Sequence, residues 1–130
     1  MSARILVAED EESIVASLEF LMRRSGFDTR VARDGEAALA SLREFRPHLV
    51  ILDIMLPLVS GFEICRQVRG DAALRGTRVL MLTARGGTGE EARAMAAGAD
   101  EYMTKPFSTQ ELVARVRALL GPVAVPDARP

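Results

Sequence analysis

The sequence has 130 residues, a length that suits one domain with its own hydrophobic core. Its net charge of −1, with 48% hydrophobic and 27% charged residues, indicates a globular chain with no general attraction to DNA or to anionic membranes. The single cysteine, Cys65, excludes an internal disulfide, and no signal peptide or membrane-spanning stretch is present, so we expect a cytoplasmic protein.

Strand-like and helix-like segments alternate along the chain. The apolar run Arg4–Ala8 predicts a strand, and apolar residues at helical spacing predict a helix over Glu12–Ser25 that Gly26 ends. The same alternation predicts further strands and helices: strands over Asp28–Ala32, His48–Leu52, Arg78–Leu82 and Glu101–Thr104, and helices over Glu36–Phe45, Gly61–Val68, Glu90–Ala97 and Ser108–Leu120. Continuous apolar strands separated by helices predict a parallel sheet covered on both faces, in a doubly wound α/β fold.

The end of the sequence differs from the rest in composition. The segment from Gly121 to Pro130 holds three prolines and has little apolar periodicity. We therefore expect one domain over residues 1–121, followed over residues 122–130 by a flexible tail or the start of a linker.

Reactive side chains stand where four of the predicted strands end. Glu9 and Asp10 follow the first strand, and Asp53 follows the third. Thr83 follows the fourth strand, and Lys105 follows the fifth. Because ligands in open parallel sheets bind outside the carboxyl ends of the strands, we expect these groups to gather at one edge. Three carboxylates, a hydroxyl and an amine there predict a site for a divalent cation and a phosphoryl group.

Each of these residues has a simpler interpretation when it is taken alone. Glu9 and Asp10 would be acids that favour the N-terminus of the next helix. Thr83 would satisfy backbone groups at a strand end, and Lys105 would be a solvated charge. The site interpretation is favoured because all of them fall at the same ends of neighbouring strands. The only histidine, His48, precedes a strand and is interpreted as a surface residue.

Longer motifs surround these residues. The third strand runs into Leu52-Asp53-Ile54-Met55-Leu56-Pro57, which Gly61 follows, and residues Gly98–Phe107 read Gly-Ala-Asp-Glu-Tyr-Met-Thr-Lys-Pro-Phe. With Glu9-Asp10 before them and Thr83-Ala84 between them, this ordered set resembles the receiver domain of two-component response regulators. The resemblance covers nearly the whole chain and implies a bacterial protein with a flavodoxin-like, five-stranded parallel sheet of order 2-1-3-4-5 and five helices.

The resemblance assigns a role to each acid. It implies that Asp53 is the phosphoacceptor and that Mg²⁺, or Mn²⁺, is the cofactor. Asp10 would bind the cation directly and Glu9 through water, while Asp53 and the backbone carbonyl of Met55 would complete the protein ligands. A carboxylate nucleophile is chemically suited to forming an acyl phosphate.

The resemblance also assigns the groups that contact the phosphoryl oxygens. Lys105, the Thr83 hydroxyl and the backbone N–H of Ala84 would hold them. Thr83 and Tyr102 would then form a switch that changes the face made by the fourth helix, the fifth strand and the last helix. The chain would take up and lose its own phosphoryl group without turning over a separate substrate, so we do not expect an enzyme in the ordinary sense.

The implied partners are a sensor histidine kinase or phosphotransfer protein as donor, and an effector protein or an output domain as target, with no direct binding to nucleic acid or membrane. The chain is either a stand-alone receiver or the receiver of a longer DNA-binding regulator. A flavin-type ligand module on the same fold is a further alternative, although the acidic turn Glu9–Glu12 would repel phosphate in the absence of a metal.

The last helix and the loop after Asp53 both bear on how the chain would contact a partner. The last helix resembles those of receivers joined to winged-helix DNA-binding domains, which dimerise through ion pairs on this face. Glu101 and Arg115 would supply one such pair in a homodimer, whereas Glu91 would oppose pairing with Glu111. The loop Leu58-Val59-Ser60 beside Asp53 is more apolar than is usual for the family.

Overall fold

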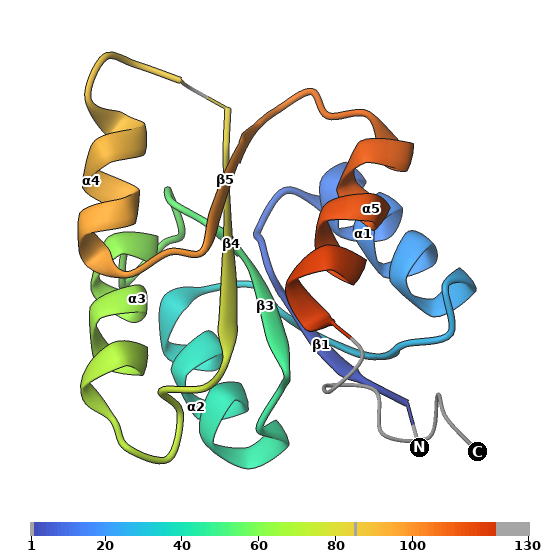
Figure 1. The fold of residues 1–130 in the computed structure, drawn as a ribbon, viewed down its shortest axis with the longest axis horizontal. Helices are drawn as coiled ribbons and strands as arrows, with labels where there is room; N and C mark the ends of the chain where they lie inside the picture. Colours follow the sequence, from blue (N-terminus) through green and yellow to red (C-terminus); the bar gives the residue numbers. More distant parts are fainter. Residues whose placement is uncertain (1, 85, 122–130) are drawn as a thin grey trace.

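Five parallel strands form one sheet in the order β2-β1-β3-β4-β5, which confirms the predicted fold (Figure 1). The structure is a computed structural model that describes residues 2–84 and 86–121. The strands are β1 (Arg4–Ala8), β2 (Asp28–Ala32), β3 (Leu49–Asp53), β4 (Arg78–Thr83) and β5 (Glu101–Thr104). The helices are α1 (Glu12–Arg24), α2 (Gly35–Phe45), α3 (Gly61–Gly70), α4 (Glu90–Ala97) and α5 (Thr109–Leu120). The tail predicted over residues 122–130 lies outside the described residues.

Helices cover both faces of the sheet. Figure 1 shows α2, α3 and α4 on one side, and α1 and α5 on the other. Side chains of the central strands alternate between the two cores because successive residues of a strand point to opposite faces. In β3, Val50 and Leu52 pack with α2 and α3, whereas Leu49 and Ile51 pack with α1 and α5. The apolar runs in the sequence are therefore strands buried on both faces.

Local signals set several helix ends as expected. Gly26 has a φ of 92° just after α1, a left-handed conformation in which glycine meets no Cβ penalty. Ser108 caps α5, since its hydroxyl accepts from the backbone N–H of Glu111 at 3.2 Å. The third helix runs two residues beyond its predicted end at Val68, to Gly70.

A half-buried ion pair fastens two loops at the end of the sheet opposite the carboxyl ends. The Arg69 guanidinium donates to the backbone oxygens of Gly98, Arg75 and Thr77 at 2.8, 3.0 and 2.7 Å. It also contacts Asp100 Oδ2 at 2.6 Å, and that oxygen accepts from the backbone N–H of Val79. One side chain of α3 thus holds the loops before β4 and before β5 together.

His48 is partly exposed, and it also takes part in the backbone pairing at the amino end of β1, a role that its interpretation as a surface residue does not include. Its Nδ1 accepts from the backbone N–H of Arg4 at 2.9 Å, and its own N–H donates to the Arg4 carbonyl at 2.8 Å. Partial burial, and then the charge of Arg4, lower the pKa of His48 below its ordinary value of 6.5.

This lowered pKa predicts a pH-dependent stability. As pH falls through about 6.5, the unfolded chain takes up the His48 proton before the folded chain does. The contribution of His48 is therefore complete above that value and is lost as pH falls towards the folded pKa. We expect His48→Asn, which keeps an acceptor and cannot become charged, to flatten this part of the profile. Denaturant unfolding of both proteins between about pH 5 and 8 measures the difference, and parallel profiles would contradict the assignment.

Candidate functional site

The five predicted site residues come together at the carboxyl edge of the sheet. Register explains this, because Asp53 of β3 pairs with Leu82 of β4, and Thr83 of β4 pairs with Thr104 of β5. Glu9 follows β1 directly, and Lys105 follows β5 directly. The strand ends are level, so side chains far apart in sequence share one edge, as expected for this fold.

The three acids form a cluster that suits a cation. One carboxylate oxygen from each of Glu9, Asp10 and Asp53 lies within 4.8 Å of the other two. Glu9 and Asp53 are buried, at 1% and 5% exposure, whereas Asp10 is exposed. Hard divalent cations such as Mg²⁺ prefer carboxylate oxygens together with water. The cluster therefore presents two fixed acids and one that opens to solvent.

Glu9 supplies the sharpest indication that a cation fits. Its Oε2 accepts from the backbone N–H of Glu11 at 3.1 Å. Its Oε1 is the one buried side-chain polar atom in residues 2–84 and 86–121 with no hydrogen bond of ordinary geometry. The ion pair with Lys105 Nζ at 2.8 Å is the contact that offsets its burial. Burial raises the pKa of Glu9, against the opposing effect of Lys105. A cation, or water bound to one, would satisfy this oxygen.

Lys105 is the only lysine in the sequence, and its ammonium group sits between two acids. Nζ lies 2.8 Å from Glu9 Oε1 and 3.7 Å from Asp53 Oδ2, and the side chain is 11% exposed. Burial alone would lower the pKa of Lys105, but the close contact with the Glu9 carboxylate and the charge of Asp53 raise it above its ordinary value. The backbone N–H of Lys105 donates to the Thr83 carbonyl at 2.7 Å, which fixes the start of this loop. The amine is thus a fixed positive charge beside Asp53.

The two oxygens of the Asp53 carboxylate have different surroundings. Oδ1 accepts from the backbone N–H of Met55 at 3.1 Å, while Oδ2 faces Lys105. Behind it, α3 packs closely: a Cβ built on Gly61 would lie 2.7 Å from the Asp53 carbonyl oxygen. Glycine at position 61 therefore lets the start of α3 approach the strand that ends in Asp53.

This close approach predicts the effect of Gly61→Ala. The added methyl group must displace the end of β3, so we expect a loss of about 1–3 kcal/mol in the free energy of unfolding. Because Asp53 moves with the strand, we also expect weaker Mg²⁺ binding in calorimetric titration. Gly70→Ala is the control, since a Cβ on Gly70 meets no atom within 4 Å. Equal Mg²⁺ affinity for the two variants would argue against a positioning role for Gly61.

The two predicted switch residues differ in exposure. Thr83 is fully buried at the end of β4, and Ala84, the next residue, is exposed. Tyr102 of β5 is partly buried, and its hydroxyl donates to Glu90 Oε1 at 2.7 Å. Burial, together with this bond to a carboxylate, raises the pKa of Tyr102 to about 12. The tyrosine is therefore tied to the first turn of α4, a contact that nothing in the sequence near Tyr102 or Glu90 indicates.

The pair suggested for a homodimer is made within the single chain. Arg115 of α5 contacts Glu101 of β5, and it also lies 2.9 Å from Glu111 Oε2. Glu91 and Glu111 line the same shallow pocket on this face. A cross-subunit pair through Arg115 would therefore compete with contacts that the chain already makes.

The loop after Asp53 has an unusual backbone. Leu58 is 71% exposed and has a φ of 76°, in the left-handed region that non-glycine residues rarely adopt. Met55, in the same loop, is 65% exposed. Val59 packs against Gly35 at the start of α2. A Cβ built on Gly35 would lie 2.5 Å from the Val59 Cβ, so the loop and this helix are in close contact. The loop that follows Asp53 thus carries two exposed apolar side chains.

The model of the response regulator receiver domain family matches residues 5–117. No helix within the described residues is long and apolar enough to cross a membrane.

Two curated relatives illustrate the similarity. The DNA-binding response regulator MtrA of Mycolicibacterium smegmatis is 47% identical over 120 residues, which are 92% of this chain and 51% of that protein. The alkaline phosphatase synthesis transcriptional regulatory protein PhoP of Bacillus subtilis is 45% identical, over 92% of this chain and 49% of that protein. The chain spans about half the length of these relatives.

Solved structures share the fold. A response regulator from Chloroflexus aurantiacus has a TM-score of 0.88 at 34% identity, covering 92% of this chain and 98% of that one. The receiver domain of the Pseudomonas aeruginosa sensor histidine kinase PA1611 has a TM-score of 0.85 at 26% identity, covering 93% and 99%. That second structure holds a magnesium ion in its active-site cleft.

Proposed function

This chain belongs to the response regulator receiver domain family, and on that premise we propose that it accepts a phosphoryl group on Asp53 from a sensor histidine kinase or phosphotransfer protein. The observation that carries the proposal is the arrangement of Glu9, Asp53 and Lys105. Two buried carboxylates share one ammonium group, and one of their oxygens lacks an ordinary hydrogen bond.

Asp53 acts as the nucleophile in the proposed transfer. One of its carboxylate oxygens forms a bond to phosphorus as the bond between phosphorus and the donor atom breaks, and the donor keeps the electron pair. The N–H of Met55 orients the carboxylate through Oδ1. Lys105, 3.7 Å from Oδ2, offsets the charge that the incoming group brings next to Asp53.

A divalent cation would be held by the acids. Asp10 and Asp53 would be direct ligands, Glu9 would act through water, and the Met55 carbonyl would complete the protein share. When bound, Mg²⁺ or Mn²⁺ neutralises charge on the acids and on the phosphoryl oxygens. The exposure of Asp10 supports this assignment, as does Glu9 Oε1, which is paired with the Lys105 ammonium group but has no hydrogen bond of ordinary geometry.

Phosphorylation of Asp53 would change the output face through three groups, namely the Thr83 hydroxyl, the backbone N–H of Ala84 and Tyr102. The acyl phosphate adds about −1.5 to −2 charges and three acceptor oxygens, which Thr83 and the Ala84 N–H would bind. The proposed switch would also change the hydrogen bond from Tyr102 to Glu90 at the start of α4. Phosphorylation would favour the active state only if the phosphoryl group interacts more favourably with that state than with the inactive one.

We further propose a transcriptional output through a domain that follows residue 130. MtrA and PhoP are named as a DNA-binding and a transcriptional regulator, and this chain matches about half of each. Residues 1–121 would then be the receiver and residues 122–130 the start of a linker. Sequencing the natural reading frame downstream tests this: a winged-helix domain supports it, and a stop codon would leave a stand-alone receiver.

Intact mass spectrometry tests the acceptor role. The chain is incubated with acetyl phosphate and Mg²⁺, and we expect the gain of one phosphoryl group. Asp53→Asn and a metal-free sample should show no gain. Asp28→Asn is the matched control, since Asp28 is exposed at the start of β2, and it should gain the group normally. Full phosphorylation of Asp53→Asn would refute the assignment of the acceptor.

A further inference from the structure

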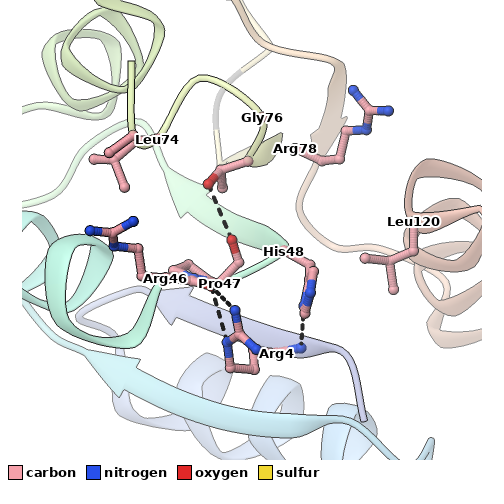
Figure 2. Close-up of a pocket in the computed structure, with 10 residues that line it drawn as sticks. Arg4, Arg46, Pro47, His48, Leu74, Gly76, Arg78 and Leu120 are labelled. Carbon is pink, nitrogen blue, oxygen red and sulfur yellow. Dashed lines mark hydrogen bonds between the residues drawn. The ribbon is translucent and has the colours of Figure 1, made fainter. Parts of the chain in front are cut away.

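A basic pocket lies at the amino edge of the sheet, opposite the acidic site. It has a volume of about 360 Å³ and is formed by the amino ends of β1 and β4, the segment between α2 and β3, the loop before β4 and the last residue of α5. Figure 2 shows Arg46 and Arg78 on either side of His48, with Arg4 below. The family function assigned above uses none of these residues.

The charged residues that line the pocket are all basic. Arg4, Arg46 and Arg78 line it together with His48, and no acidic residue does. Within residues 2–84 and 86–121, no carboxylate lies within ion-pair distance of these three guanidinium groups. The whole chain carries a net charge of −1, so this is a local excess of positive charge and not a general property of the surface.

Backbone contacts fix all three arginines. Arg46 Nε donates to the Arg43 carbonyl at 3.3 Å. Arg4 Nε and Nη2 donate to the Arg46 carbonyl at 3.0 and 2.7 Å, and Nε also reaches the Phe45 carbonyl. Arg78 Nε donates to the Leu119 carbonyl at 3.2 Å. These bonds anchor the side chains while further N–H groups of each guanidinium have no acceptor in the part of the chain that is described. Fixed guanidinium groups bind phosphate oxygens well because less side-chain freedom is lost.

Apart from Thr77, the residues that line the remainder of the pocket are apolar or glycine. Pro47, Leu74 and Leu120 line it, and a Cβ built on Gly76 meets no atom within 4 Å. A volume of about 360 Å³ lies within the range of small-ligand sites. We propose that this pocket binds a small organic phosphate, with its phosphate near the arginines and its apolar part against these residues.

A phosphate bound there would contact residues at the amino ends of β1, β3 and β4, next to the end of α5. Arg78 already links β4 to the final turn of α5, and Leu120 closes the pocket from that helix. The site lies at the end of the strands opposite Asp53, so it neither needs nor tests the acceptor role of that residue. Binding should therefore be the same in Asp53→Asn.

The test is an NMR titration of the full chain with phenyl phosphate, inorganic phosphate and phenol. The ring signal of His48, the only histidine, reports on the pocket. We expect a saturable shift with phenyl phosphate, a weaker affinity for inorganic phosphate, and no shift with phenol. The double variant Arg46→Gln with Arg78→Gln should weaken phenyl phosphate binding at least about tenfold.

The control is Arg43→Gln with Arg75→Gln, which removes the same charge from exposed arginines that do not line the pocket. It should bind phenyl phosphate like the wild type. The proposal is overturned if the His48 signal shows no saturable shift, or if the control loses as much affinity as the pocket variant. Equal shifts with phenol would also overturn it, because they would show that the arginines contribute nothing.

Discussion

Replacing Lys105 with methionine should lower the free energy of unfolding by about 3–5 kcal/mol when no divalent cation is present. The substitution removes the ammonium group from Glu9 and Asp53, which are 1% and 5% exposed. Methionine fills a similar volume, so the loss reflects two buried carboxylates without a counter-charge. Urea unfolding in a chelating buffer measures it, and Mg²⁺ should restore part of the deficit because it supplies positive charge to the same oxygens.

Arg33→Met is the matched control for this experiment. It also removes one cation from an ion pair, but Arg33 and Glu12 are exposed, at 51% and 81% of their side chains. Exposed pairs contribute about 0–1 kcal/mol, so this variant should stay close to the wild type. A Lys105→Met protein as stable as Arg33→Met would show that the buried acids do not depend on the lysine.

The second large effect is expected at Arg69. Arg69→Met should cost about 3 kcal/mol, because three backbone carbonyls and Asp100 lose a charged donor. Arg69→Lys should recover little of it, since an ammonium group lacks the planar fork that reaches several acceptors at once. Thermal or urea unfolding of the two variants gives the comparison.

Arg66→Met separates this effect from simple loss of charge on α3. Arg66 lies 3.9 Å from Glu63, and both side chains are about half exposed. We expect a change of less than about 1 kcal/mol. Full recovery by Arg69→Lys would mean that charge alone, and not the forked hydrogen bonding, holds the two loops.

Much of the fold follows from signals that are local in sequence. The apolar run before Asp53 is long enough to be buried on both faces, and Gly26 marks the end of α1 because glycine tolerates a φ of 92°. Strand ends then bring Glu9 and Lys105 to Asp53, since parallel strands in register end at the same edge. The pattern thus predicted which residues meet in the candidate site.

Contacts between distant segments were not predictable in the same way. Arg69 and Asp100 are 31 positions apart, and nothing near either residue indicates that they pair. The neighbours of His48 in sequence likewise do not indicate that its ring replaces a backbone acceptor for Arg4. The bond from Tyr102 to Glu90 likewise depends on how α4 lies against β5.

The order of the strands also has a consequence for how the acidic site comes into being during folding. Glu9 and Asp53 come from neighbouring strands, yet 44 residues separate them, and Lys105 lies a further 52 residues along the chain. Such non-local pairings form late, because a long loop must close before any contact compensates for its lost entropy. A chain emerging from the ribosome brings its two buried acids out well before the lysine that neutralises them. The complete charge arrangement therefore exists only after β5 has joined the sheet.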